Sequence, residues 1–144
     1  MKKELEALRK YLSAHKLKLT RTRLLIFEEI FSSKKIHPNA YEIFQALKEK
    51  GHKISLATIY RTLNLLVKSG LVSEIDLGEG HSHYEPEIVK STHGHLVCLS
   101  CGRVQEFSDE KILAMLNKIG KESRFKTDKF SIQVFGYCKS CQKK

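Results

Sequence analysis

The chain has 144 residues, of which 41% are hydrophobic, and it carries a formal net charge of +10 with a pI of about 9.5. This length suits one large domain or two small ones, and no apolar run approaches the length of a membrane span, which excludes a membrane-spanning protein. The positive excess suits a polyanionic partner, for which nucleic acid and an anionic membrane surface are the candidates.

Apolar side chains at helical spacing predict four helices in the first half of the chain. Thr20 is positioned to cap the second helix, and Ser55 or Thr58 can cap the fourth. The first is expected over residues 3–14. The second helix has the apolar face Leu24, Ile26, Phe27, Ile30 and Phe31. The third runs to about Lys50, with Tyr41, Ile43, Phe44 and Leu47 inward. The fourth carries Ile59, Leu63, Leu66 and Val67 and stops at Gly70.

A two-stranded hairpin is predicted after the fourth helix. The run Leu71–Asp76 alternates like a strand, Gly78 and Gly80 mark a turn, and His81–Glu85 returns. Helices followed by a hairpin form the outline of a winged helix, with the fourth helix as the recognition helix. Its polar positions lie away from the apolar stripe, where they can reach phosphates and base edges: Ser55, Thr58, Tyr60, Arg61 and Asn64. The alternative is a plain helical bundle with a solvated face.

Pro86 and the residues after it predict a hinge, which divides the chain into a domain at 1–85, a hinge at 86–92 and a domain at 93–144. Two short strands, a helix and an alternating strand are expected in the second domain. We therefore expect an α+β protein with a small second domain. The expected elements are Leu96–Val97, Val104–Phe107, a helix at about Asp109–Glu122 with a stripe of Leu113, Leu116 and Ile119, and a strand with Phe130, Ile132 and Val134 on one face.

All four cysteines lie in two Cys-x-x-Cys pairs, Cys98/Cys101 and Cys138/Cys141. Two such pairs predict a tetrahedral Cys₄ site for structural zinc, with Gly102 giving the first pair the freedom that its turn needs. Disulfides are the alternative, but Met1–Glu6 lacks the apolar core of a secretion signal, and a reducing cytoplasm favours metal. A redox motif would explain one pair only.

A second metal site is predicted from borderline and hard ligands outside the cysteines. His93 and His95 alternate along a strand and so point the same way, directly before the first cysteine pair. Imidazole and carboxylate ligands suit Fe(II), Mn(II), Co(II), Ni(II) or Zn(II). The remaining candidates are His37, His81, His83, Glu85 and Glu106. The alternative for each single histidine is an ordinary surface or core position.

Three segments resemble the ferric uptake regulator family, in the same order and over essentially the whole chain. They are His37-Pro-Asn-Ala-Tyr-Glu-Ile-Phe44, Ile54-Ser-Leu-Ala-Thr-Ile-Tyr-Arg-Thr-Leu63 and His93-x-His95-x-x-Cys98-x-x-Cys101-Gly102. The resemblance implies a homodimeric, metal-responsive transcription regulator. It also implies a winged-helix DNA-binding domain followed by a dimerisation domain that holds a structural zinc.

The resemblance also implies roles for individual residues. Tyr60 and Arg61 match recognition-helix residues that touch bases, and Lys18 and Arg23 match basic residues that approach the minor groove. The structural zinc ligands would be Cys98, Cys101, Cys138 and Cys141. The regulatory metal between the domains would be bound by His37, Glu85, His93, His95 and Glu106.

Departures from the family pattern narrow the expected function. The run His93-Gly94-His95 is short, which implies that a further histidine-rich site of many members is absent. Peroxide-sensing members carry aspartates at the positions of Glu85 and Glu106, so the resemblance favours iron sensing, with Fe(II) as corepressor. Peroxide, zinc and manganese sensing remain alternatives, and Mn(II), Zn(II) or Co(II) are expected to substitute for Fe(II). His81 and His83 lie outside the family motif; we expect them on the wing surface, and the alternative is that they add metal ligands.

Two other classes, metalloenzymes and zinc-ribbon adaptors, account for fewer features of the sequence. A zinc deaminase needs His-x-Glu with Pro-Cys-x-x-Cys, and a zincin needs His-Glu-x-x-His; neither motif occurs in the sequence. We therefore expect no enzyme and no small-molecule substrate. A zinc-ribbon adaptor would explain the cysteines but not the histidines or the basic helices. The expected partners are an operator in duplex DNA and a second copy of the chain, in the cytoplasm and without a membrane.

Overall fold

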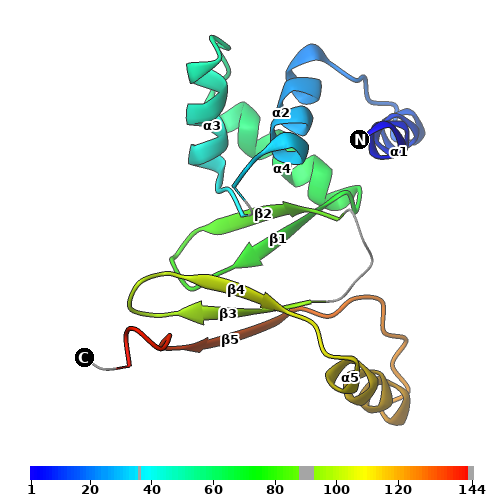
Figure 1. Ribbon diagram of the computed structural model, residues 1–144. Coiled ribbons are helices and arrows are strands. Elements are labelled where there is room, and N and C mark those ends of the chain that lie inside the picture. Colours follow the sequence, from blue (N-terminus) through cyan, green and yellow to red (C-terminus); the bar gives the residue numbers. More distant parts are fainter. Residues whose placement is uncertain (36, 88–92, 143–144) are drawn as a thin grey trace. The chain divides into compact units, whose positions relative to one another are not determined.

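The computed structural model describes residues 1–35, 37–87 and 93–142, and the chain divides into two compact units, Met1–Val89 and Lys90–Lys144 (Figure 1). Within the described residues there are five helices and five strands, which confirms the predicted α+β class.

The first unit consists of four helices followed by a hairpin (Figure 1). Each predicted helix is confirmed, with ends within a few residues of those expected. Its elements are α1 (Lys2–Ala14), α2 (Arg21–Ser32), α3 (Ala40–Glu49), α4 (Leu56–Lys68), β1 (Val72–Asp76) and β2 (Ser82–Pro86).

Side-chain caps set where three of these helices begin. Thr20 accepts a hydrogen bond from the backbone N–H of Arg23, as predicted, and Ser55 does the same for Thr58 at the start of α4. Asn39 and Glu42 form a reciprocal capping box at α3. Each cap satisfies N–H groups that the helix itself cannot pair, and losing one costs about 1 kcal/mol.

The core of the first unit lies where the apolar stripes of its helices meet. Most of the predicted inward positions are buried, but Tyr41 is 56% exposed, so its predicted inward position is wrong. Tyr41 lies in the first turn of α3 and its hydroxyl accepts a hydrogen bond from Gln45 along the outer face. The buried set is Leu8, Leu12, Ile26, Phe27, Ile30, Ala40, Ile43, Leu47, Ile59, Leu63, Leu66, Val72 and Tyr84.

The hairpin is antiparallel, and its second strand also pairs with the segment before α3. Ile75 lies opposite His83 in the register, and Asn39 forms an isolated antiparallel bridge with His83. The backbone N–H of Tyr84 donates to the carbonyl of Pro38 at 2.9 Å. This pairing brings the 37–39 segment against β2, although 43 or more positions separate them in sequence.

Part of the predicted hinge continues the hairpin. Pro86 ends β2, and the backbone N–H of Glu87 donates to the carbonyl of Leu71 at 2.9 Å. The rest of the predicted hinge, residues 88–92, lies outside the described residues.

The second unit is a three-stranded sheet with one helix (Figure 1). Its elements are β3 (Gly94–Cys98), β4 (Val104–Phe107), α5 (Glu110–Glu122) and β5 (Ile132–Gly136). The strand order is β4-β3-β5, with β3 antiparallel to β4 and parallel to β5. The parallel pairing is possible because the antiparallel β4 returns the chain to the end at which β3 begins, and α5 with its loops then crosses from the β4 edge to the β5 edge.

Helix α5 leaves most of its apolar side chains exposed. Asp109 caps it directly before its first residue, Glu110, and Gly120 is its only buried residue. Leu113 and Leu116 are half-buried, whereas Ile119 is 52% exposed, so the predicted inward stripe is wrong at Ile119. Among the described elements, α5 packs closely against none of the strands, which leaves its apolar side chains exposed.

Candidate metal centres and nucleic-acid interface

The four cysteines come together at one end of the second sheet. Cys98 is the last residue of β3, and its register partner across the parallel pair is Gly136 at the end of β5. Cys138 follows two residues later, so the strand pairing itself brings the two Cys-x-x-Cys segments together. The four sulfurs all lie within 4.8 Å of one another, and 3.8 Å separates Cys101 Sγ from Cys138 Sγ.

Backbone hydrogen bonds bend each pair into a tight turn. The N–H of Gly102 donates to the carbonyl of Cys98 at 2.9 Å, and the N–H of Cys141 donates to that of Cys138 at 2.8 Å. Gly102 has a φ of 72°, a conformation that residues with a Cβ rarely adopt. A tetrahedral zinc with Zn–S bonds of about 2.3 Å requires sulfurs about 3.8 Å apart, so this cluster fits a structural zinc.

The surroundings of the cluster favour the thiolate, which is the form that binds metal, at Cys98 and Cys138. At Cys141 a hydrogen bond with Ser100 lowers the thiol pKa, but the contact with Cys138 and burial outweigh it and raise the pKa to about 11. The backbone N–H of Cys101 and then that of Cys138 lower the pKa of the Cys98 thiol to about 6. The N–H of Cys141 in turn lowers the pKa of the Cys138 thiol. Amide dipoles directed at a sulfur stabilise its negative charge, so less free energy is needed to deprotonate these two ligands when zinc binds.

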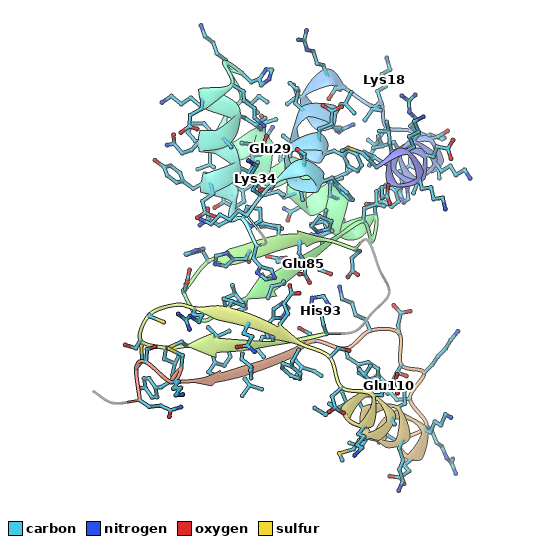
Figure 2. All side chains as sticks on the ribbon, in the orientation of Figure 1. Lys18, Glu29, Lys34, Glu85, His93 and Glu110 are labelled. Carbon is cyan, nitrogen blue, oxygen red and sulfur yellow. The ribbon has the colours of Figure 1, made fainter. Side chains whose placement is uncertain are left out.

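His37 and Glu85 meet within the first unit. His37 Nε2 lies 3.1 Å from Glu85 Oε2, and the imidazole is 8% exposed. The two residues are 48 positions apart, and the pairing of β2 with the 37–39 segment brings them together. Glu85 extends from β2 (Figure 2). A nitrogen and a carboxylate oxygen at this separation form half of a site for a divalent metal.

A second pair of ligand types lies within the second unit. His95 is opposite Glu106 in the β3–β4 register and is 4% exposed. His95 Nε2 lies 4.0 Å from Glu106 Oε1, and His93 Nε2 lies 3.9 Å from the same oxygen. His93 directly precedes β3 (Figure 2). The predicted regulatory ligands therefore fall into two half-sites, His37/Glu85 and His93/His95/Glu106, and their meeting around one ion stays a prediction.

The hairpin carries a third group of ligand types, at Glu79, His81 and His83. The predicted surface position is wrong for His83, which is buried at 7% exposure, and right for His81, whose side chain is 44% exposed. His83 is buried because β2 pairs with Asn39 on that side. Glu79 was missed from the sequence; its place two residues before His81 was the available signal.

The predicted DNA-binding residues lie on α4 and beside α2. Tyr60 is 45% exposed and Arg61 is exposed, one and two positions after the buried Ile59. Ser55 and Thr58 have their hydroxyl oxygens 2.8 Å apart at the N-terminus of α4, where helix N–H groups favour an anion.

The side chain of Lys18 is exposed, whereas that of Arg23 is held by a hydrogen bond. Lys18 is exposed on the segment between α1 and α2 (Figure 2), whereas the Arg23 guanidinium donates to the carbonyl of Lys18 at 2.5 Å. Arg23 therefore holds the segment that presents Lys18. None of the helices in the described part of the chain is long and apolar enough to cross a membrane.

Comparisons with known proteins point to one family. Residues 14–135 match the model of the ferric uptake regulator family. The ferric uptake regulation protein of Legionella pneumophila is 36% identical over 126 residues, covering 88% of this chain and 92% of that protein.

Two solved structures are similar over nearly their whole length. The Helicobacter pylori ferric uptake regulator matches with a TM-score of 0.82 at 29% identity, over 98% of this chain and 93% of the H. pylori chain. Its structure is described as revealing three functional metal binding sites. The Campylobacter jejuni peroxide stress regulator has a TM-score of 0.70 at 30% identity, covering 92% and 97%. The family match, the winged-helix unit and the Cys₄ cluster agree: this chain belongs to the ferric uptake regulator family of transcription regulators.

Proposed function

We propose that this protein is a homodimeric, metal-dependent DNA-binding repressor that acts in the cytoplasm, with Fe(II) as corepressor and one structural zinc per chain. The observation that carries the proposal is the pair of half-sites, one in each unit. Each half offers imidazole nitrogen and carboxylate oxygen, which are the ligand types of Fe(II), Mn(II), Co(II) and Zn(II) sites. His37/Glu85 supplies one half, and His93/His95/Glu106 supplies the other.

A metal ion that takes ligands from both halves would couple sensing to DNA binding. Such an ion binds only the arrangement in which the two halves meet, and it therefore shifts the population toward that arrangement. An ion with equal affinity for every arrangement would shift nothing. In the metal-bound dimer the two winged helices would match successive operator half-sites, which a helix-turn-helix dimer reads about one DNA turn apart.

Fe(II) is preferred because both carboxylate positions are glutamates, Glu85 and Glu106, as in iron-sensing members. The similarity to the peroxide stress regulator of Campylobacter jejuni keeps peroxide sensing as the second candidate. Fe(II)-dependent duplex binding, measured before and after addition of hydrogen peroxide, separates the two, because a peroxide sensor should release the duplex at peroxide concentrations that an iron sensor tolerates.

The exposed apolar residues of the second unit support a homodimer. Val134 and Phe135 on β5 and Ile112, Met115 and Ile119 on α5 are each between 38% and 63% exposed. So many large apolar side chains on a unit of this size mark an association surface. A second copy of the same unit would cover α5 and the sheet edge at β5 with a symmetric interface.

The test of the proposal is metal-dependent recognition of duplex DNA. Zinc-loaded protein with Mn(II), the air-stable probe for the iron site, should select a palindromic sequence from a random pool of duplexes. Fluorescence anisotropy should then show binding that needs Mn(II) and weakens as salt rises. A zinc-ribbon adaptor would select no duplex, with or without Mn(II).

Arg61→Ala should reduce sequence discrimination, whereas Lys18→Ala should weaken all DNA binding. A bidentate base contact is worth about 1–3 kcal/mol of discrimination, so Arg61→Ala should lose about 5- to 150-fold preference for the selected duplex over a scrambled one. Lys18→Ala should lower both affinities together and flatten the salt slope by about one unit. Lys126→Ala, an exposed lysine of the second unit, is the matched control. Unchanged preference in Arg61→Ala would mean that α4 does not read the bases.

A further inference from the structure

Glu79, His81 and His83 converge in the loop and second strand of the hairpin. A single carboxylate oxygen, Glu79 Oε2, lies 3.1 Å from Nε2 of His81 and 3.1 Å from Nε2 of His83. The two imidazole rings are 4.9 Å apart between centroids. Gly78 and Gly80 have φ values of 77° and 79°, and this left-handed backbone turns Glu79 back over β2. Three ligand atoms of two types thus face one point.

The orientation of His83 is fixed by its other nitrogen. Nδ1 lies 2.7 Å from the backbone carbonyl oxygen of His37. A carbonyl oxygen can only accept, so Nδ1 carries a proton, and the neutral ring then presents a lone pair at Nε2 toward Glu79. Metal-binding histidines are commonly oriented by this kind of hydrogen bond from the second nitrogen. The ring is also buried, so it has little freedom to turn away.

His81 is oriented in the same sense by a weaker contact. Asn39 Nδ2 lies 3.3 Å from its Nε2, which the amide N–H reaches as a donor when that nitrogen holds a lone pair. The His83 lone pair therefore points toward a carboxylate that also offers only lone pairs. The His81 nitrogen lies 3.1 Å from the same carboxylate oxygen and would give up its contact with Asn39 to bind an ion there. Such an arrangement of acceptors is satisfied by a cation at the centre or by a proton on the imidazoles.

We propose that Glu79, His81 and His83 form a further divalent-metal site, held entirely within the DNA-binding unit. Two imidazoles and one carboxylate suit borderline ions such as Zn(II), Co(II) and Ni(II), with water completing the coordination. None of its ligands belongs to the two half-sites of the proposed sensor. The hydrogen bond from His83 to the His37 carbonyl links this ion to the segment before α3, so its binding stiffens the hairpin loop against that segment.

Cobalt titration of the full zinc-loaded chain tests the proposal. The background variant carries His95→Ala and Glu106→Ala, which removes two ligands of the proposed sensor and leaves the first unit unchanged. Visible absorption reports Co(II) on nitrogen and oxygen ligands, and the absence of thiolate-to-cobalt bands shows that zinc stays in the Cys₄ site. Paramagnetic broadening of amide signals locates the ion along the chain.

We expect the background variant to bind one Co(II) per chain and to broaden the signals of residues 78–83. Adding Glu79→Gln or His81→Ala should each weaken Co(II) binding at least tenfold, and His15→Ala, an exposed histidine on a different segment, should leave it unchanged. Glu79 and His81 are both more than 40% exposed, so these changes should leave the fold and zinc content intact. The proposal would be overturned if the background variant took up no Co(II), or if its Co(II) uptake were unchanged by Glu79→Gln or by His81→Ala. A proton would then be what joins the imidazoles to the Glu79 carboxylate. DNA binding does not enter this readout, so a failed sensor proposal would not alter it.

Discussion

Cys138→Ser should lose its zinc and leave the second unit unfolded or monomeric. The four sulfurs tie the end of β3 to the segment that follows β5, and the sheet beside them buries few large side chains. Structural zinc contributes about 10–16 kcal/mol of apparent binding free energy in small zinc domains, which exceeds or matches the total stability of a typical domain. A serine hydroxyl is a poor substitute for a thiolate, so most of this free energy should disappear.

Metal analysis, circular dichroism melting and sedimentation measure this outcome together. Ser140→Ala is the matched control, because it lies between the two ligands of the same turn, is exposed and offers no sulfur. It should keep one zinc per chain and the parent's melting curve. A Cys138→Ser protein that retains normal dimers and normal melting would show that zinc does not hold the second unit together.

His93→Ala should keep the fold, the dimer and the zinc, yet lose the response of DNA binding to metal. The imidazole is 27% exposed and lies 3.9 Å from Glu106 Oε1, before the zinc turn and outside its ligand set. Coupling free energies between sites are commonly 1–3 kcal/mol, so the parent should bind the selected duplex about 5- to 150-fold more tightly with Mn(II). The variant should show less than about a twofold change.

Anisotropy titrations with and without Mn(II) give both ratios, and His15→Ala should respond like the parent. The metal-free affinities of parent and variant should agree, because His93 is not a DNA contact in this account. If His93→Ala responds to Mn(II) like the parent, the second half-site does not take part in sensing. That result would not affect the assignments of the zinc site and the winged helix.

Local signals explain why the helices were predictable. Thr20, Asn39 and Ser55 each act within three residues of their own position, and the apolar stripes of α2 and α4 are read from spacing alone. The two cysteine pairs were equally clear, because the chemistry of zinc requires that spacing. Tyr41 and Ile119 were predicted inward because spacing does not tell which neighbour is there to cover a side chain.

The spacing of residues along the sequence could not predict the contacts between distant segments. Only the pairing of β2 with the 37–39 segment shows that His37 faces Glu85 and that His83 is buried beneath the same segment. The resemblance to the family named His37 and Glu85 as ligands, but it contained no signal for Glu79 or for the two imidazoles that face it. Glu79 depends on the backbone of Gly78 and Gly80, whose positive φ values aim the loop back at β2.

Manganese binding in the presence and absence of DNA tests the central claim most directly. Linkage requires that the factor by which two Mn(II) ions tighten duplex binding by the dimer equals the product of the factors by which the duplex tightens the two Mn(II) sites. Electron paramagnetic resonance of free Mn(II) measures this affinity for the zinc-loaded dimer alone and with the selected duplex. For a factor of about 5- to 150-fold on duplex binding, the account predicts that the duplex tightens each of the two equivalent Mn(II) sites by about 2- to 12-fold. A Mn(II) affinity that the duplex leaves unchanged would contradict metal-dependent DNA recognition by this protein.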